Sequence, residues 1–451
     1  MSSVSAGRIQ RRGVCVAAVG GLVLAALGGG VAVAEEEPQS DQLWIQAPYE
    51  QTVTVAPAGG VAAYRSLALG LYHDNDNFTV TDGRINVDIS GLAGVAEVAW
   101  PDNCTPADAD GTTAVCDTGD VSVFAKTSFE LKVRAVEGAA LGAEGLISYS
   151  AEATGGPEGT LTTPEGWSET TVRVGSGPDL GIAHPAALTD VAPGTVLTAP
   201  SVITNTGNEA AQGFTVWMAA TYGIDFVTKF PECTYPEAGE SGDTKQVSCS
   251  FDTVVEPGAT VELPEPLKLA VNSRALYDRF DISVQPGGDT EDLDGRDNYR
   301  AWSIGAANTA DFAVRGSDVS GAAGETVDAT FRFVNRGPAW VAHVFSGDAP
   351  ALIDFTVPEG TTATTVPELC QPRTLDGEWI ERRVGAPRYT CFLPSAAFPG
   401  LTVDYAFELR VDRVVPDATG TVVAHPERGT GHPFPFDPTP RNNTAKVVVN
   451  G

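Results

Sequence analysis

Two short stretches of the sequence gather oxygen donors of the kind that bind calcium. They are YHDNDNF at 72–78 and GDTEDLDGRDN at 288–298. Carboxylate and amide oxygens are the ligands that Ca²⁺ takes in proteins, but the second stretch does not follow the 12-residue calcium loop, because its glycine would put Thr290 at the first ligand position. A calcium ion between structural units is one hypothesis and two solvated turns are the other; no other cofactor is expected. The candidate ligands are Asp74, Asp76, Asp292, Asp294 and Asp297.

A second candidate site is the loop QPRTLDGEWIERRVGAPRYT between Cys370 and Cys391. On an otherwise acidic protein it carries tryptophan, tyrosine and arginine, the side chains most often found in binding hot spots. The candidate contact residues are Trp379, Arg382, Arg383, Arg388 and Tyr389. A disulfide at the base of the loop would present it to a partner. In the alternative, the tryptophan folds back onto its own unit and the arginines pair with nearby acids.

Catalytic signatures are missing from the sequence. The five histidines lie apart, four of them next to Pro, Asp or Gly, and no GxSxG, HExxH or P-loop pattern occurs. The histidines are His73, His184, His343, His425 and His432. We therefore expect no enzyme activity, and a secreted hydrolase of unfamiliar type is the alternative, because a triad is recognised by geometry and not by order.

The cysteines predict local disulfides. Apart from Cys15, the six cysteines fall into three close pairs, one in each third of the chain. Six cysteines allow 15 pairings, and this distribution makes local pairing the simplest choice. The expected disulfides are Cys104–Cys116, Cys233–Cys249 and Cys370–Cys391. No histidine lies near any pair, so a zinc site is not favoured.

Residues 1–34 have the pattern of a signal peptide. Three arginines precede an apolar run over 13–33 that ends in Ala32-Val33-Ala34. A membrane anchor is the alternative, and the export route, general secretory or twin-arginine, stays open. Cleavage after Ala34 would change the formal charge from -30 to -33, a surface that repels nucleic acid and anionic membranes. No second run of eighteen apolar residues follows, so no transmembrane segment is expected after cleavage.

Two stretches of the chain repeat. PGTVLTAPSVITNTG at 193–207 aligns with AGETVDATFRFVNRG at 323–337, and the glycine precedes the asparagine by the same step in both. Gly258 and Gly400 likewise follow the second cysteine of each pair at equal distance. The offset between the two copies grows from 130 to 142 between these landmarks, partly inside the cysteine pair. Insertions confined in this way indicate loops on a constant scaffold.

Alternating hydrophobicity predicts strands. In TVDYAFELRVD at 402–412 the apolar residues fall on every second position, and 327–333 shows the same pattern. With 49 Gly and 31 Pro spread along the chain, the sequence predicts an all-β fold of tandem β-sandwiches. Asn-x-Gly is expected to turn the chain where a long strand ends. The expected domains are 35–177, which is divergent or differently folded, 178–308 and 309–451.

Residues 178–451 resemble the bacterial extracellular immunoglobulin-like repeat family related to the cell-adhesion-related domain in bacteria. The resemblance rests on the opening Asp, PG-x-T-V, N-x-G, a cysteine pair, a second PG-x-T-V and a closing Asn. The matching residues are Asp179, Gly194, Asn205, Gly207, Cys233, Cys249, Gly258 and Asn298, then Asp311, Gly324, Asn335, Gly337, Cys370, Cys391, Gly400 and Asn443. Ala323 departs from the pattern, and Asp297-Asn298 closes the first copy where the family has Asn-Asn.

The resemblance implies immunoglobulin-like sandwiches in a secreted or surface-attached protein without catalysis. The expected function is a structural or adhesive module at the cell envelope, with an unknown protein or a cell-wall glycan as partner and no nucleic acid. A soluble carbohydrate- or wall-binding accessory protein is the alternative within the binding class.

Overall fold

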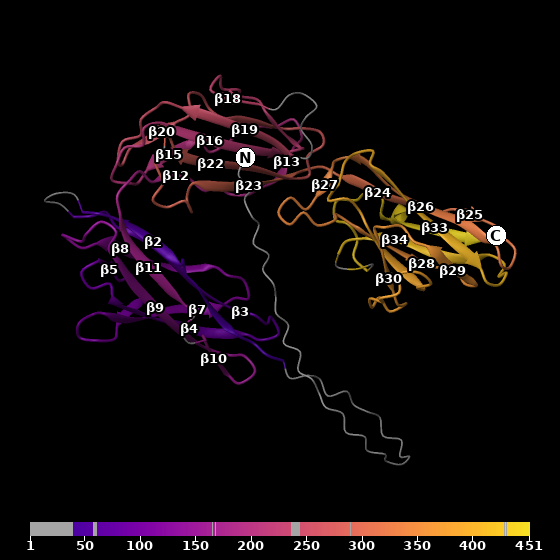
Figure 1. Ribbon diagram of the computed structural model, residues 1–451, viewed down its shortest axis with the longest axis horizontal. Coiled ribbons are helices and arrows are strands. Elements are labelled where there is room, and N and C mark those ends of the chain that lie inside the picture. Colours follow the sequence, from indigo (N-terminus) through magenta and orange to yellow (C-terminus); the bar gives the residue numbers. More distant parts are fainter. Residues whose placement is uncertain are drawn as a thin grey trace, which may run out of the picture.

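The computed structural model describes residues 39–451 except 57–60, 165, 167, 236–243, 289, 428 and 430. The expected signal peptide, 1–34, and Cys15 lie outside the described residues. The described chain contains β-strands and one short 3-10 helix, η1 (Pro440–Asn443), but no α-helix (Figure 1). The predicted all-β fold is confirmed. Within the described residues, no helix has the length and apolar character needed to cross a membrane.

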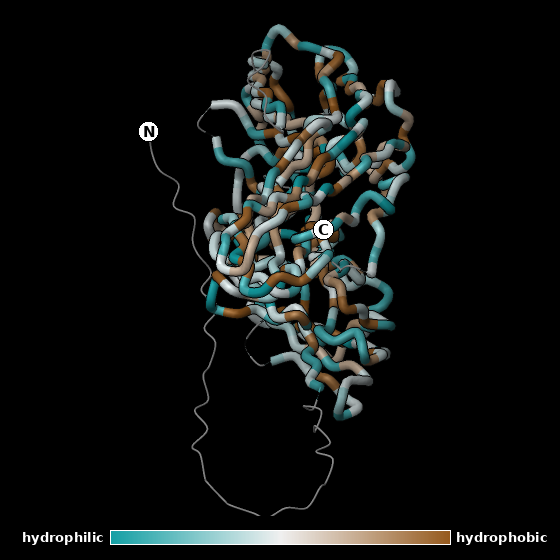
Figure 2. The backbone as a smooth tube through the Cα atoms, turned by 90° about the vertical axis from the view of Figure 1, so that its right-hand side faces the viewer, coloured by the Kyte–Doolittle hydropathy of each residue, from teal (hydrophilic) through white to brown (hydrophobic). Residues whose placement is uncertain are grey.

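The strands form because apolar residues alternate with polar ones. In β33 (Thr402–Val411) the side chains of Tyr405, Phe407 and Leu409 are buried and those between them are exposed. Strand β26 (Thr326–Pro338) buries one face in the same way. Figure 2 shows short hydrophobic and hydrophilic stretches following one another along the chain. The alternation read from the sequence therefore gives one buried and one wet face.

The first unit, β1 to β11, consists of two sheets around one core. Its larger sheet has the order β2 (Glu50–Thr54), β11 (Glu169–Gly175), β9 (Glu144–Thr154), β4 (Val80–Gly91), β7 (Thr113–Val121) and β6 (Cys104–Pro106), and β10 (Thr160–Thr162) pairs with β9. Its smaller sheet has the order β1 (Leu43–Gln46), β3 (Arg65–His73), β8 (Thr127–Ala135) and β5 (Ala96–Ala99). The core between them is formed by residues from 43 to 174.

The second unit, β12 to β23, has its own core from 180 to 304. Its larger sheet has the order β13 (Leu188–Val191), β23 (Tyr299–Ala306), β22 (Tyr277–Pro286), β16 (Phe214–Thr221), β19 (Thr244–Phe251) and β18 (Cys233–Thr234). The opposite layer is split into β12 (Leu180–Ile182), β15 (Val202–Asn205) and β20 (Thr260–Glu262), and β14 (Val196–Thr198), β21 (Lys268–Val271) and β17 (Ile224–Phe226).

The third unit, β24 to β35, packs a third core, mainly from 310 to 449. Its larger sheet has the order β25 (Asp318–Val319), β35 (Thr444–Val449), β34 (Ala418–His425), β28 (Leu352–Thr356), β31 (Arg388–Phe392) and β30 (Cys370–Arg373). The opposite sheet has the order β24 (Ala310–Arg315), β26, β33 and β29 (Thr361–Thr365), and β27 (Val341–Ala342) pairs with β32 (Ala396–Ala397).

The larger sheets of the three units share one strand order. In each, a short edge strand runs parallel to the last strand of the unit: β2 to β11, β13 to β23 and β25 to β35. The remaining strands follow in the same sequence to a cysteine-bearing edge hairpin. The first unit, which diverges in sequence, therefore keeps the topology of the other two and is not differently folded.

Each edge hairpin contains one disulfide, and the pairing matches the one expected from the sequence. Cys104 and Cys116 lie opposite each other on β6 and β7, Cys233 and Cys249 on β18 and β19, and Cys370 and Cys391 on β30 and β31. The Cα atoms of each pair are 3.9 to 4.0 Å apart. The disulfides therefore close three loops at the same edge of three equivalent sheets.

The repeated asparagine does more than turn the chain. Asn335 is fully buried; its Nδ2 donates to the carbonyls of Ala339 and Ala397 at 2.9 and 2.8 Å, and its Oδ1 accepts from Gly337 N at 2.9 Å. Asn205 makes the equivalent bonds and also accepts from Asp179 N at 3.0 Å. The asparagine is therefore a buried hydrogen-bonding hub that ties three backbone segments together.

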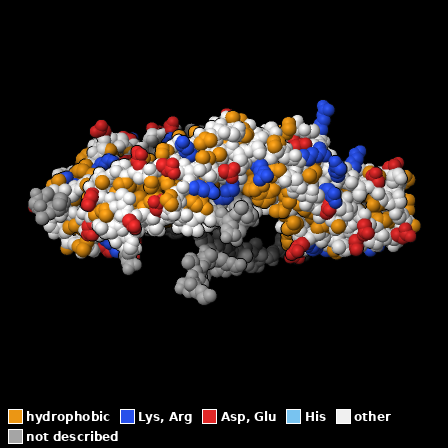
Figure 3. All heavy atoms as spheres, turned by 90° about the horizontal axis from the view of Figure 1, so that it is seen from above, with side chains coloured by type: hydrophobic (Ala, Val, Ile, Leu, Met, Phe, Trp, Pro, Cys, Tyr) orange, Lys and Arg blue, Asp and Glu red, His pale blue; other side chains and the backbone are white. Residues whose placement is uncertain are grey.

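The three units follow one another in space as they do in sequence (Figure 1). The first unit lies below the second, the third extends to the right, and the C-terminus lies at its far end. Seen from above, acidic side chains are spread along the whole face, and Lys and Arg side chains gather at the middle and on the right (Figure 3).

The contact between the second and third units is apolar and centred on Trp340. This residue is 1 % exposed, and its Nε1 donates to Oδ1 of Asp278 at 3.1 Å. Its ring stacks on Phe398 with centroids 5.8 Å apart and meets Tyr222 edge-on at 5.7 Å. A fully buried tryptophan with its N–H satisfied is a strong anchor for a domain contact.

Candidate functional site

The loop between Cys370 and Cys391 projects from the larger sheet of the third unit. Its most exposed apolar side chains are Leu375 at 63 % and Trp379 at 57 %, and Arg382 and Arg383 lie exposed beside them. An exposed tryptophan flanked by arginines is the composition of a protein-contact surface. The structure thus exposes three of the five candidate contact residues: Trp379, Arg382 and Arg383.

This loop is held in shape by its own backbone and by arginine side chains, among them Arg388, whose Nη1 donates to Leu375 O at 3.2 Å. Thr374 N donates to Glu378 O at 2.8 Å, and Arg373 forms an antiparallel bridge with Trp379. Arg383 Nη2 donates to Pro367 O at 2.7 Å, which fastens the loop to the preceding segment. Because the loop is already ordered, contact with a partner would cost little conformational entropy.

Tyr389 is buried and Arg388 is only partly exposed, which corrects the prediction from the sequence for these two of the five candidate contact residues. Tyr389 is fully buried with its ring 5.1 Å from that of Phe407, and its hydroxyl donates to Arg383 O at 3.0 Å. Arg388 forms an ion pair with Asp354. The two residues are consecutive on β31, so their side chains lie on opposite faces of the sheet: Tyr389 enters the core, and Arg388 lies on the other face against Asp354.

Asp354 is the centre of a polar cluster beneath the loop. It binds Arg388, accepts from Thr390 Oγ1 at 2.7 Å and lies 2.9 Å from His425 Nε2. Burial alone would raise the pKa of this carboxyl, but the hydrogen bonds from these three side chains hold it below the usual value. Burial would likewise lower the pKa of the His425 imidazole, but Asp354 and the Pro426 carbonyl raise it.

The cluster predicts an optimum of stability in mildly acidic solution. Because the pKa of Asp354 is lowered, its contribution is present above about pH 4 and is lost as the pH falls through the folded value. Because the pKa of His425 is raised, its contribution is full below about pH 6.5 and is lost as the pH rises through the folded value. The melting temperature of the third unit should therefore decrease as the pH is raised from 6 to 8. Calorimetry should show a smaller decrease in His425→Gln. Equal slopes in both proteins would contradict the assignment.

The first acidic stretch is a hydrogen-bonded turn. Asp41 accepts from the backbone N–H groups of Asp74 and Asn75, both at 3.0 Å, and binds His73 at 2.9 Å. The carboxylate of Asp74 accepts from Trp44 Nε1 at 2.8 Å. Among the described residues neither Asp74 nor Asp76 joins a group of three His, Cys, Asp or Glu side chains close enough to share a metal ion.

The second acidic stretch lies at the contact between the first and second units. Asp292 and Asp297, on the segment between β22 and β23, meet Asp179 from the start of β12. One carboxylate oxygen of each lies within 4.8 Å of the others. Asp294, the third candidate on this stretch, forms an ion pair with Arg296 at 2.6 Å and is not part of the group.

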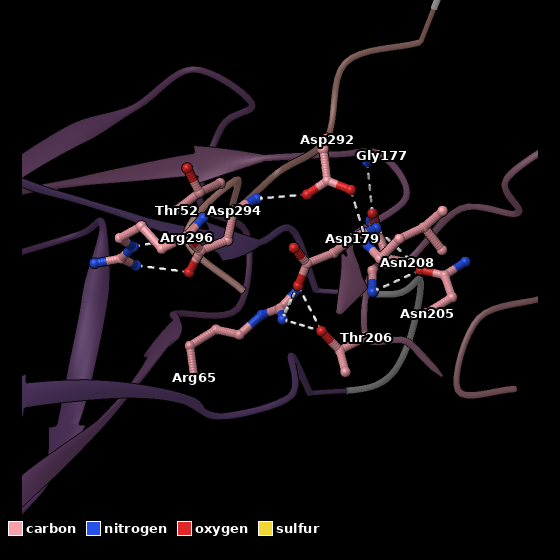
Figure 4. Close-up of polar contacts among 12 residues, drawn as sticks. Thr52, Arg65, Gly177, Asp179, Asn205, Thr206, Asn208, Asp292, Asp294 and Arg296 are labelled. Atoms are coloured by element: carbon pink, nitrogen blue, oxygen red, sulfur yellow. Dashed lines mark hydrogen bonds and ion pairs between the residues drawn. The ribbon is translucent and has the colours of Figure 1, made fainter. Parts of the chain in front are cut away.

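Two arginine side chains link this part of the second unit to the first unit. Arg65, on β3, forms a nearly buried ion pair with Oδ2 of Asp179. Thr206 Oγ1 donates a hydrogen bond to the same oxygen (Figure 4). Arg296 Nη2 donates to Oε1 of Gln51, on β2, at 2.9 Å. Burial and the negative charges of Asp179, Asp294 and Asp292 raise the pKa of Asp297 to about 7.

An apolar groove of about 540 Å³ lies where the second unit meets the third. Its walls include Tyr277, Ile304, Phe434 and Phe436, and Phe345 stands at its edge, 65 % exposed, under the guanidinium of Arg279 at 4.4 Å. No motif in the sequence marks this groove, because its walls come from two units and are brought together only by the fold.

The five histidines lie in separate surroundings. Both ring nitrogens of His425 are occupied, by Asp354 and by the Pro426 carbonyl at 2.7 Å. His73 is buried against Asp41. His184 is exposed and contacts the Pro185 carbonyl. His343 lines the apolar groove, and His432 is exposed in a loop.

No family model and no curated protein matches this chain. Among solved structures, it is similar to a putative membrane anchored protein from Corynebacterium diphtheriae, with 8 % identity, a TM-score of 0.19 and coverage of 90 % of this chain and 95 % of that one. It is also similar to the Escherichia coli adhesin FdeC, with 10 % identity, a TM-score of 0.20 and coverage of 92 % and 98 %. Similarity this low carries no information about binding.

Proposed function

We propose that this chain is a secreted, non-enzymatic adhesive module of the bacterial cell envelope, from the immunoglobulin-like repeat family that it resembles. Its contact surface is the loop of the third unit between Cys370 and Cys391. The observation that carries the proposal is the exposure of Trp379 and two arginines on a loop that a disulfide and backbone hydrogen bonds hold in one shape.

The composition of the loop favours a protein as the partner. Sugar-binding faces use several aromatic rings side by side, and Trp379 is the one aromatic side chain exposed on this loop. Arginine and tryptophan together are typical of hot spots between proteins. The exposed arginines stand out on a chain with a formal charge of -30, so they would also select an acidic partner surface.

Three disulfides support export, because such bonds persist in oxidising surroundings outside the cytoplasm. They close loops at one edge of three equivalent sheets, an arrangement that presents variable segments on a constant scaffold.

Removing the exposed side chains should weaken binding without unfolding the protein. The double variant Trp379→Ala, Arg382→Ala is expected to lower affinity for the envelope partner at least about 30-fold, since each hot-spot truncation costs about 1–2 kcal/mol or more. Arg383 is left in place because it fastens the loop. Binding to isolated envelopes, titrated with labelled protein, measures the effect.

The matched control is Phe124→Ala, Arg84→Ala in the first unit, which also removes one exposed aromatic residue and one exposed arginine. It should bind as the wild type does. Unchanged affinity in the loop variant, at an unchanged melting temperature, would reject the loop as the contact surface.

A further inference from the structure

The carboxylate group between the first and second units contains oxygens that no donor satisfies. Asp292 accepts from Leu180 N at 2.8 Å and Asp294 N at 3.0 Å. Asp179, whose side chain is fully buried, uses Oδ2 for Arg65 and Thr206, but its Oδ1 has no hydrogen-bond partner in the described chain. Oδ1 of Asp297 is also buried and unpartnered there. In Figure 4 one oxygen of Asp179 accordingly carries no dashed line.

Leaving such groups unpaired is unfavourable. A buried carboxylate oxygen without a donor loses its hydration and gains nothing in return. Asp297 also forms no ion pair with Lys or Arg in the part of the chain that the structure describes, whereas Asp179 and Asp294 do. The group therefore needs a further positive charge or donor.

The third unit shows how the same arrangement is satisfied internally. Asp437 lies six residues before Asn443, as Asp292 lies six before Asn298, and it accepts from Phe312 N at 3.1 Å and Thr439 N at 2.7 Å. Asp311 takes the place of Asp179. At the position of Asp297 the third unit has Asn442, whose Nδ2 donates to Oδ1 of Asp311 at 2.7 Å.

The two units thus differ at one decisive atom. In the third, an amide donates to the oxygen that has no partner in the second, where the carboxylate of Asp297 faces Asp179 instead. Two carboxylates at this distance repel each other unless a cation or a proton lies between them.

We propose that Asp179, Asp292 and Asp297 bind one divalent cation, calcium, through their carboxylate oxygens, and that this ion fixes the first unit to the second. Calcium accepts carboxylate oxygens in irregular geometry. The segment that carries Asp292 and Asp297 also carries Arg296, which donates to Gln51 of the first unit. Asp179 is paired with Arg65 of the first unit. Ordering the segment therefore orders the contact between units. The inference does not depend on the proposed function.

The test uses the purified protein, stripped with EDTA and studied at pH 8, where Asp297 would be mostly ionised and a shared proton is disfavoured. Calorimetric titration with CaCl₂ should show one specific site. At calcium about 100-fold above Kd the melting temperature should rise by roughly 5–10 °C. Sodium chloride of equal ionic strength should not reproduce the shift, and magnesium chloride tests whether the site prefers the larger ion.

The variant Asp297→Asn should abolish both the site and the shift, and should be folded because Asn442 occupies the same place in the third unit. Asp120→Asn, an exposed acid on β7, makes the same charge change and should respond as the wild type does. Equal shifts in the wild type and Asp297→Asn would mean diffuse attraction to an acidic surface and overturn the proposal. A wild type indifferent to calcium would also overturn it, leaving a proton as the shared charge.

Hydrogen exchange on the wild type gives a readout that does not need the variant to fold. Calcium should slow exchange of the amides at 177–181 and 290–298. Unchanged exchange in both segments, at calcium concentrations that saturate the titration, would place the ion elsewhere and contradict the assignment.

Discussion

Asn335→Ala is expected to destabilise the third unit by about 4 kcal/mol, near the upper limit for a single substitution. The side chain is fully buried and makes three hydrogen bonds to the backbone, two as donor and one as acceptor. Alanine would leave two carbonyls and the N–H of Gly337 without partners, and a buried group left unpaired costs about 1–3 kcal/mol. The three costs are not additive, because the segments can relax.

Calorimetry measures this effect as a fall of roughly 10 °C in the transition that contains the third unit. Arg336→Ala is the control, because the neighbouring side chain is exposed and its contact with Asp311 is 3.7 Å long; it should change stability by less than about 0.5 kcal/mol. If both variants melt alike, the asparagine is only a turn residue.

Trp340→Ala is expected to uncouple the second unit from the third. The substitution removes a fully buried indole, which lowers the free energy of unfolding by about 3–5 kcal/mol. It also takes one hydrogen-bond donor from Asp278. Burial raises the pKa of that carboxyl, and hydrogen bonds including the one from Trp340 oppose the shift. Since the ring also contacts Phe398 and Tyr222, its loss opens the contact between units.

The expected calorimetric result is that units melting together in the wild type separate into two transitions in the variant. Small-angle scattering should show a broader range of shapes. Trp217→Ala is the control, because that tryptophan is 37 % exposed on β16. One shared transition in Trp340→Ala, at the wild-type temperature, would show that the contact does not couple the units.

Much of this architecture could be predicted from local sequence. Alternation of apolar and polar residues over 402–411 predicts β33 and its buried face. The close spacing of the cysteines predicts the three hairpin disulfides. The equivalent glycines Gly194 and Gly324 both have φ of 91°, as aligned turn positions require. These features depend on neighbours in the chain, which a single sequence displays.

The role of Asn-x-Gly was only partly predicted. Strand β15 does end at Asn205, but β26 continues to Pro338, three residues past Asn335. Gly337 has φ of 76°, as a turn glycine would. Gly207 is required for another reason: a Cβ there would lie 2.3 Å from Gly177 O. The buried hub was missed because its partners lie up to 62 residues away.

The candidate sites show the same limit. Trp379 could be predicted because tryptophan and arginine occur together in the loop between two cysteines, whereas Tyr389 was misassigned because loop composition does not show which face of β31 is buried. Asp179 was missed as a possible ligand, although the sequence aligns it with Asp311 as the opening aspartate of each repeat. Its partners Asp292 and Asp297 come only near the end of the second unit, after β22, so their proximity is created by the fold.

The most direct test of the adhesive function is where the natural protein is found. Cells expressing the wild type and the Trp379→Ala, Arg382→Ala variant would be fractionated and probed by immunoblot. We predict that the wild type sediments with salt-washed envelopes, that protease treatment of the envelopes abolishes rebinding, and that the variant is released into the medium. Wild-type protein found entirely free in the medium would contradict an adhesive role at the envelope.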